Sequence, residues 1–185
     1  IYRKRLLVYS LLCVALATGN ALFWLHKWHE QGVELCFADT MMTGVQPSFL
    51  LMLLIPPTLG LVHQLKFILE QPFVICALDN RARLARNLLA ALLFIAFRAV
   101  MAVSIPSIAL GALLFRGGKP CTWESGASYY AYMTGQTLIT PVKTGSLIVW
   151  QAMTIWLTVL LVSILFLSIN LSCESHQLGS ILSWG

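Results

Sequence analysis

The sequence predicts an all-α fold, a polytopic transmembrane helix bundle that forms one membrane domain over residues 1–185. Hydrophobic residues make up 58% of the 185 residues and charged residues only 10%, whereas a soluble domain is about half apolar and a quarter charged. Four segments are apolar over the roughly 20 residues that a helix needs to cross the hydrocarbon core. Lysines and arginines gather at the ends of these segments, as they do at the cytoplasmic ends of membrane helices.

Each of the four segments is apolar almost throughout. They cover about residues 6–26, 47–66, 88–115 and 145–172. Besides Lys66 at the very end of the second segment, Arg98 is the one formal charge that they contain. Prolines at 56, 57 and 106 predict kinks in the second and third spans, because proline removes a helix hydrogen bond and clashes with the preceding turn.

The distribution of lysine and arginine predicts which ends of the spans face the cytoplasm. With the N-terminus inside, seven of these residues are cytoplasmic, namely Arg3, Lys4, Arg5, Lys66, Arg81, Arg83 and Arg86. Four are outside, namely Lys27, Arg116, Lys119 and Lys143. The positive-inside rule therefore favours a cytoplasmic N-terminus, with outer loops at 27–46 and 116–144. The net charge of +5 is small and sits at the span ends, so we expect a lipid bilayer and no nucleic acid as partner.

Aromatic residues gather in the parts of the chain assigned to the outside. Indole rings prefer the membrane interface, so we expect an outer cluster of Trp24, Trp28, Trp123 and Trp150. The second outer loop also holds three tyrosines within 129–132. This loop is predicted either to lie as an amphipathic helix on the outer leaflet or to cap a cavity.

The inner loop between the second and third spans contains the most informative segment, 72–86. A short apolar run, too short to span, is followed by a polar break that can cap a helix and by a basic helical stalk that enters the third span. Its candidate functional residues are Phe73, Val74, Leu78, Asp79, Arg81, Arg83 and Arg86. One interpretation is an interfacial helix whose arginines lie on anionic lipid. The other is a docking helix for a cytoplasmic partner subunit.

The stretch 67–86 resembles the coupling helix of a known family, the membrane subunits of ABC transporters of the exporter-like permease type. This family includes permeases for peptide export and for lantibiotic or bacteriocin immunity. Its pattern is an apolar patch, a small or polar break, and then Arg-x-Arg/Lys running into the third span. Here these parts are 73–78, 79–80 and 81–83. Such permeases usually have six spans, so four spans are expected of a piece of a longer permease.

The resemblance implies a permease subunit that moves a hydrophobic or amphipathic substrate, such as a peptide, lipid or antibiotic, across a bacterial plasma membrane. It implies a cytoplasmic ATPase subunit that carries ATP and Mg²⁺, and a second membrane subunit in a homo- or heterodimer. The chain itself has no Gly-x-x-x-x-Gly-Lys-Ser/Thr, Gly-x-Ser-x-Gly or His-Glu-x-x-His sequence, so we expect no enzyme, catalytic residue or cofactor in it. The alternative function is a non-transporting scaffold or assembly subunit of a larger membrane complex.

Arg98 lies inside a span, where an arginine costs roughly 2.5–3.5 kcal/mol on an insertion scale. None of the four spans contains an Asp or Glu that could pair with it. Either its long side chain reaches the inner headgroups, or it faces a polar cleft or another subunit. In the second case Asn20 and Gln151 are candidate neighbours, with His63 and Asn170 as further polar residues of the spans.

Two groups of metal-binding or redox-active residue types lie in the parts assigned to the outside. Cys36 and Cys121 fall one in each outer loop, so an oxidising exterior would allow a disulfide between them. The sequence alone does not bring them within bonding range. His26 and His29 share a helix face beside Glu30, but no third zinc ligand is evident. We therefore expect no metal site.

Overall fold

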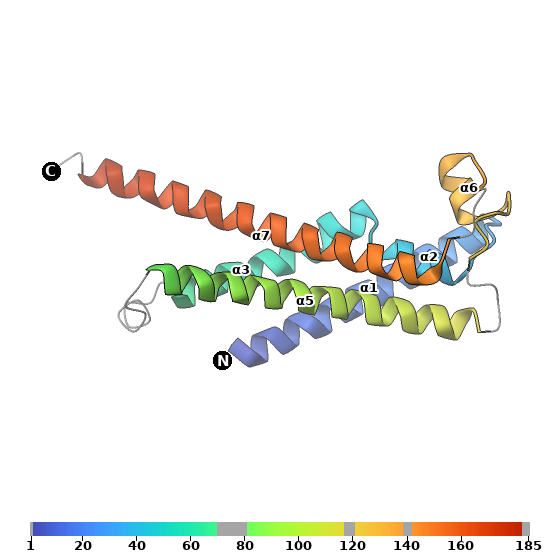
Figure 1. Ribbon diagram of the computed structural model, residues 1–185, viewed down its shortest axis with the longest axis horizontal. Helices are drawn as coiled ribbons and strands as arrows, with labels where there is room; N and C mark the ends of the chain where they lie inside the picture. The colour runs from blue at the N-terminus through green and yellow to red at the C-terminus, as the bar shows by residue number, and fades with distance from the viewer. Residues whose placement is uncertain (1, 70–80, 117–120, 139–141, 183–185) are drawn as a thin grey trace.

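The computed structural model confirms the all-α fold and describes residues 2–69, 81–116, 121–138 and 142–182 (Figure 1). Its helices in chain order are α1 (Tyr2–Glu30), α2 (Phe37–Thr43), η1 (Phe49–Leu54), α3 (Ile55–Leu69), α5 (Arg81–Leu114), α6 (Tyr129–Thr134) and α7 (Thr144–Leu182). Over these described ranges, β structure is limited to one isolated bridge, between Glu34 and Ser128.

Three of these helices are long and apolar enough to cross a membrane, namely Lys4–Glu30, Ala85–Leu114 and Thr144–Asn170. They correspond to the first, third and fourth expected spans. The second expected span corresponds to η1 and α3, whose apolar part, Phe49–Leu65, is shorter. At 1.5 Å per residue this part is about 25 Å long, below the roughly 30 Å of a hydrocarbon core. The described residues thus provide three full-length apolar helices and one shorter one.

The prolines expected to kink the second span lie in the first turn of α3, immediately after a turn of π-helix. The chain stays helical through Pro56 and Pro57, and the preceding turn, η1, is widened. The hydrogen bond at the end of η1 has the residue separation of a π-helix, since the Ile55 N–H donates to the Leu50 carbonyl five residues earlier. A π-helical turn of this kind accommodates a local irregularity without ending the helix. The helix α5 likewise continues through Pro106.

The long helices pack mainly through α1 against α5 and α5 against α7, while α3 lies against α7. Small buried side chains, including Ala17, Ala96 and Ala99, line this core and allow helix backbones to approach closely. Tyr9 and Thr58 share a buried hydrogen bond of 2.9 Å that joins α1 to α3. Large apolar side chains cover much of the outer surface, as a lipid environment requires. Toward its C-terminal end, α7 diverges from the other helices (Figure 1).

The region 27–46, predicted as an outer loop, contains instead a buried helix. The helix α1 continues to Glu30, and α2 then inserts against α1, α5 and α7. Two glycines show how closely it packs. A Cβ at Gly44 would overlap the Gln151 amide, and a Cβ at Gly111 would come within 2.6 Å of the Phe37 ring. The sequence did not reveal this packing, because seven residues are too few to show a helical period.

The two predicted outer loops do lie together at one end of the bundle, which we call the α6 end (Figure 1). There the Glu34 N–H donates to the Ala127 carbonyl at 2.8 Å. The Ser125 hydroxyl donates to the Glu34 carboxylate, also at 2.8 Å. We call residues 31–48 and 121–138, which include α2 and α6, the cap. At the opposite end, the basic end, lie the start of α1, the end of α3 and the start of α5 (Figure 1).

Candidate functional site

The cap is held together by a buried carboxylate that joins its two segments. Asp39 is fully buried, and its Oδ2 accepts a hydrogen bond of 2.7 Å from the Cys36 N–H at the start of α2. Its Oδ1 accepts a second bond of 2.7 Å from Nε1 of Trp123, a residue 84 positions later in the chain. Trp123 in turn stacks on Tyr130, with ring centroids 5.7 Å apart. The Asp39–Trp123 pair therefore connects α2 to the segment that carries α6.

Burial raises the pKa of the Asp39 carboxyl above its usual 3.8, and the hydrogen bonds from Trp123 and Cys36 oppose that rise. Both effects follow from the geometry, since desolvation disfavours a charged carboxylate and donated hydrogen bonds favour it. Sequence reasoning did not identify Asp39. Its one signal is its isolation, because no other Asp, Glu, Lys or Arg occurs between Glu34 and Lys66.

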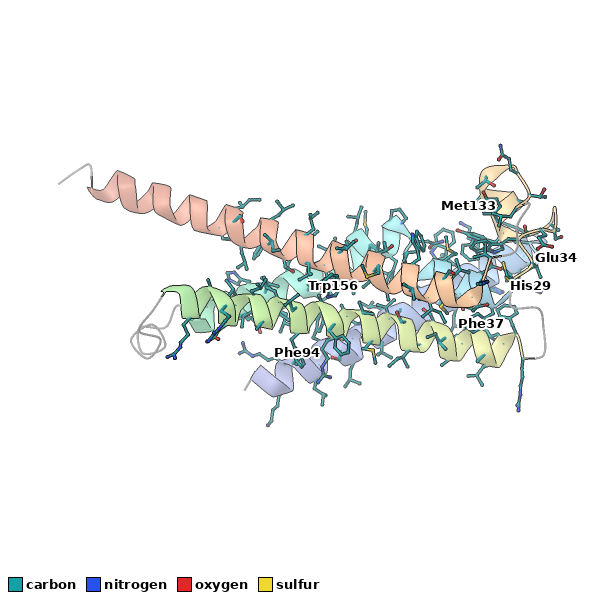
Figure 2. All side chains as sticks on the ribbon, in the orientation of Figure 1. His29, Glu34, Phe37, Phe94, Met133 and Trp156 are labelled. Atoms are coloured by element: carbon teal, nitrogen blue, oxygen red, sulfur yellow. The ribbon has the colours of Figure 1, made fainter. Side chains whose placement is uncertain are left out.

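Beside this pair, the cap and the end of α1 enclose a cavity of about 430 Å³. Four elements provide its wall: α1, the segment from α2 to η1, α6 and α7. The lining residues are Trp24, Lys27, Trp28, Gln31, Met42, Val45, Gln46, Pro47, Ser48, Tyr129, Tyr132, Met133 and Trp150. Figure 2 shows Met133 on α6 at this end of the molecule, where His29 and Glu34 also lie. Three of the four predicted outer tryptophans thus line one cavity, and the fourth, Trp123, lies in the cap.

Aromatic rings fix the shape of this cavity. The Trp28 and Tyr129 ring centroids are 4.2 Å apart, and Trp24 lies 5.7 Å from Trp28. The Lys27 ammonium sits 4.9 Å from the centre of the Trp24 ring, a cation–π contact. The loop that holds Tyr129, Tyr130 and Tyr132 thus forms the short helix α6, and Tyr129 and Tyr132 lie in the cavity wall.

The size and the lining of the cavity define which molecules would fit it. Among the described residues that line it, none is an Asp, a Glu, a His or a Cys. Its volume falls in the range of small-molecule sites, roughly 300–1,000 Å³. Aromatic and methionine side chains offer apolar contact, while Lys27 and the amide of Gln31 offer polar contact. An amphipathic molecule with a polar or anionic group suits such a wall.

The predicted cavity residues Asn20 and Gln151 lie close to α2, next to this site and not in its wall. The Asn20 amide donates to the Thr43 carbonyl at 2.9 Å. Gln151 is fully buried, and its Nε2 donates to the Ser107 hydroxyl at 3.4 Å. Within the part of the chain that the structure describes, Oε1 of Gln151 accepts no hydrogen bond. Asn20 therefore joins α1 to α2, and Gln151 joins α7 to α5.

Arg98 is not brought together with Asn20 and Gln151. It lies on α5 nine residues before Ser107, or about 14 Å along the helix axis. Its side chain is exposed, and its guanidinium carbon lies 5.2 Å from the centre of the Phe94 ring. Phe94, one turn toward the basic end, is labelled in Figure 2. Arg98 also borders an open cavity of about 360 Å³ together with Ser10 of α1 and Met101 of α5.

Most of the predicted coupling segment lies outside the described residues. This applies to Phe73, Val74, Leu78 and Asp79. The helix α5 begins at Arg81, so the predicted basic stalk does run directly into the third span. The side chains of Arg83 and Arg86 are exposed at the start of this helix.

Of the two histidines considered as metal ligands, His26 makes an ordinary helix-surface contact. His26 and Glu30 are 3.3 Å apart at (i, i+4) spacing, and both side chains are mostly exposed. Cys36 and Cys121, in contrast, do pack into one small cluster. Both are free thiols in the structure.

Comparison of the chain with family models, curated proteins and solved structures found no match. The function is therefore inferred from the geometry and the sequence.

Proposed function

We propose that this chain is the transmembrane permease subunit of an ATP-driven ABC transporter that moves a hydrophobic or amphipathic substrate. The observation that supports it most is the aromatic cavity of about 430 Å³ at one end of a bundle of apolar helices. A bundle that only anchors a complex needs packed helices, and it has no need of a cavity walled by four elements. A transporter needs a place where substrate contacts protein.

The cavity wall suggests the chemistry of the substrate. Trp24, Tyr132 and Trp150 present accessible ring surface that can bind apolar groups. The flexible Met42 and Met133 side chains adapt to irregular ones. Lys27 and Gln31 would hold a polar or anionic group at the mouth. A peptide, lipid or antibiotic with one apolar face and one polar group meets both requirements.

The energy would come from a separate cytoplasmic ATPase that carries ATP and Mg²⁺. Segment 72–86 follows α3 in the chain and includes the start of α5. The end of α3 and the start of α5 both lie at the basic end. In the proposed mechanism, closure of the ATPase moves this segment. The helix α5 transmits the movement along its length, and the side of the membrane from which the cavity can be reached then changes. A second membrane subunit would complete a homo- or heterodimer, as the resemblance of 67–86 to coupling helices implies.

The scaffold function remains the second candidate because α7 carries a long unpartnered apolar stripe. Its exposed residues recur every four positions, at Val149, Met153, Leu157, Leu161, Leu165 and Ile169. Such a stripe suits lipid, and it also suits a neighbouring membrane helix. A scaffold would use this stripe and leave the cavity unused.

Substrate-stimulated ATP hydrolysis separates the two candidates. We expect the chain, purified with its partners in mild detergent, to carry a soluble ATPase whose activity rises with some members of a panel of amphipathic peptides. Tyr132→Ala should weaken the apparent affinity for the stimulating peptide several-fold, because Tyr132 is an exposed wall residue. Phe97→Ala is the matched control, since Phe97 is equally exposed but lies away from the cavity. Equal loss in both variants, or no stimulation by any peptide, would favour the scaffold.

The proposal includes an orientation, with the N-terminus in the cytoplasm and the α6 end outside. Gly126→Cys is expected to react with an impermeant maleimide on intact cells, because Gly126 is exposed and a Cβ there meets nothing within 4 Å. Arg83→Cys, on the exposed start of α5, should react only after permeabilisation. The parent protein gives the baseline for its own cysteines. Labelling of Arg83→Cys on intact cells would invert the orientation.

A further inference from the structure

The fold brings together two cysteines that are 85 positions apart in the chain. Cys36 precedes α2 and Cys121 begins the second cap segment. Both belong to one cluster with Ala38, Trp123 and Leu147. Cys36 is a buried member of this cluster and Cys121 packs against it, so the fold places both cysteines in one small core of the cap.

The backbone around both cysteines is already fixed by other contacts. Trp123, two residues after Cys121, donates to Asp39, and Asp39 accepts from the Cys36 N–H. The Cys36 side chain is also hydrogen-bonded to the backbone of Thr122. A covalent bond between the two sulfurs would therefore demand little further ordering of the chain.

We propose that Cys36 and Cys121 form a disulfide that ties α2 to the segment carrying α6 and so fixes the wall of the aromatic cavity. The proposal rests on the orientation given above, which exposes the cap to the oxidising side of the membrane. It is independent of transport and of the ATPase.

The oxidant required is a disulfide of a thiol–disulfide exchange catalyst. Cys36 is 1% exposed and Cys121 is only partly buried, so the catalyst reaches Cys121 first. The Cys121 thiolate attacks one catalyst sulfur, breaks the catalyst disulfide and forms a mixed disulfide. The Cys36 thiolate then attacks the Cys121 sulfur and releases the catalyst. Two protons and two electrons pass from the cysteine pair to the catalyst, which leaves as a dithiol.

The environment of Cys36 determines when the second step takes place. Burial and the neighbouring Asp39 carboxylate raise the pKa of the Cys36 thiol to about 12, so little thiolate forms once the cap is closed. Burial also raises the pKa of Cys121. The disulfide therefore forms during folding, before α2 is fully packed against the other helices.

The test is a disulfide map of the full chain from native membranes, with free thiols blocked during extraction. We expect a peptide containing Cys36 linked to a peptide containing Cys121, lost on treatment with dithiothreitol. In Cys36→Ala, labelling of Cys121 by a maleimide should rise several-fold. Cys13→Ala, a change of a buried cysteine in α1, is the control and should leave the linked peptide intact.

A second readout is made on the parent protein itself, with Cys13→Ala as its control. Dithiothreitol should lower the melting temperature of the parent protein and of Cys13→Ala by several degrees, as loss of a long-loop disulfide predicts. Recovery of both Cys36 and Cys121 as blocked free thiols in the parent protein would overturn the proposal. Linkage of either cysteine to a different residue would also overturn it.

Discussion

Replacement of Trp123 by phenylalanine is expected to destabilise the cap more than any other single conservative change. Phenylalanine keeps most of the ring but lacks the Nε1 donor that bonds Asp39 at 2.7 Å. A fully buried carboxylate oxygen would then have no partner, at a cost of about 1–3 kcal/mol and more if it stays charged. Denaturant unfolding in detergent, followed by tryptophan fluorescence, measures the loss.

Trp150→Phe is the matched control for this substitution. Trp150 is about half exposed and lines the cavity. Its replacement removes an indole ring but leaves no buried carboxyl group without a hydrogen-bond donor. We expect a change of less than about 0.5 kcal/mol in the free energy of unfolding. Equal destabilisation by the two variants would contradict the structural role given to the Asp39–Trp123 pair.

The same pair gives the destabilisation a pH dependence. The pKa of Asp39 is raised in the folded protein above its usual 3.8, so the folded state binds the proton more tightly than the unfolded state. The contribution of Asp39 to folding stability is therefore greatest at pH values below 3.8. It falls as the pH rises toward the pKa that Asp39 has in the folded protein. Loss of the Trp123 bond raises the folded pKa further, so Trp123→Phe should lose more stability at pH 8 than at pH 5. A constant difference would contradict this and indicate that the protonation state of Asp39 is the same in the two folded proteins over this pH range.

Phe73→Asp and Leu78→Asp are expected to abolish partner-coupled ATP hydrolysis while leaving membrane insertion and expression intact. The reason is the apolar run 73–78, which is too short to span and would bury its side chains in a docked ATPase. A charge in that interface would lack a partner and oppose docking. The measurement is the ATPase rate of the purified complex, normalised to the amount of membrane chain.

Phe73→Leu and Leu78→Met serve as controls, because they keep an apolar side chain of similar size. Both should retain most of the coupled activity. Wild-type coupling in the two aspartate variants would rule out a docking role and favour an interfacial helix that lies in the headgroups.

The long helices were predictable because their signal is local. Apolar runs of about 20 residues set the positions of α1, α5 and α7, and their lengths brought the two outer loops to one end. The tryptophan cluster followed from the same topology. In each case a single stretch of sequence contains the whole physical cause, namely the cost of exposing polar backbone or charge to lipid.

The cap was not predictable because its cause is spread over distant residues. The helix α2 is too short to show a helical period in the sequence. The role of Asp39 depends on its hydrogen bond with Trp123, which lies 84 positions later in the chain. The tight contact of Gly44 with Gln151 likewise depends on how α2 and α7 meet. The cysteine pair was predicted by loop position alone, and its proximity required the fold.

The central claim is that segment 72–86 docks a cytoplasmic ATPase, and site-specific photo-crosslinking tests it most directly. A photoreactive amino acid at position 74, inside the apolar run, is compared with one at position 133, on the exposed surface of α6. We predict that position 74 crosslinks in living cells to a soluble protein with a nucleotide-binding loop, whereas position 133 does not. Crosslinks from position 74 only to lipid or to another membrane protein would contradict the claim.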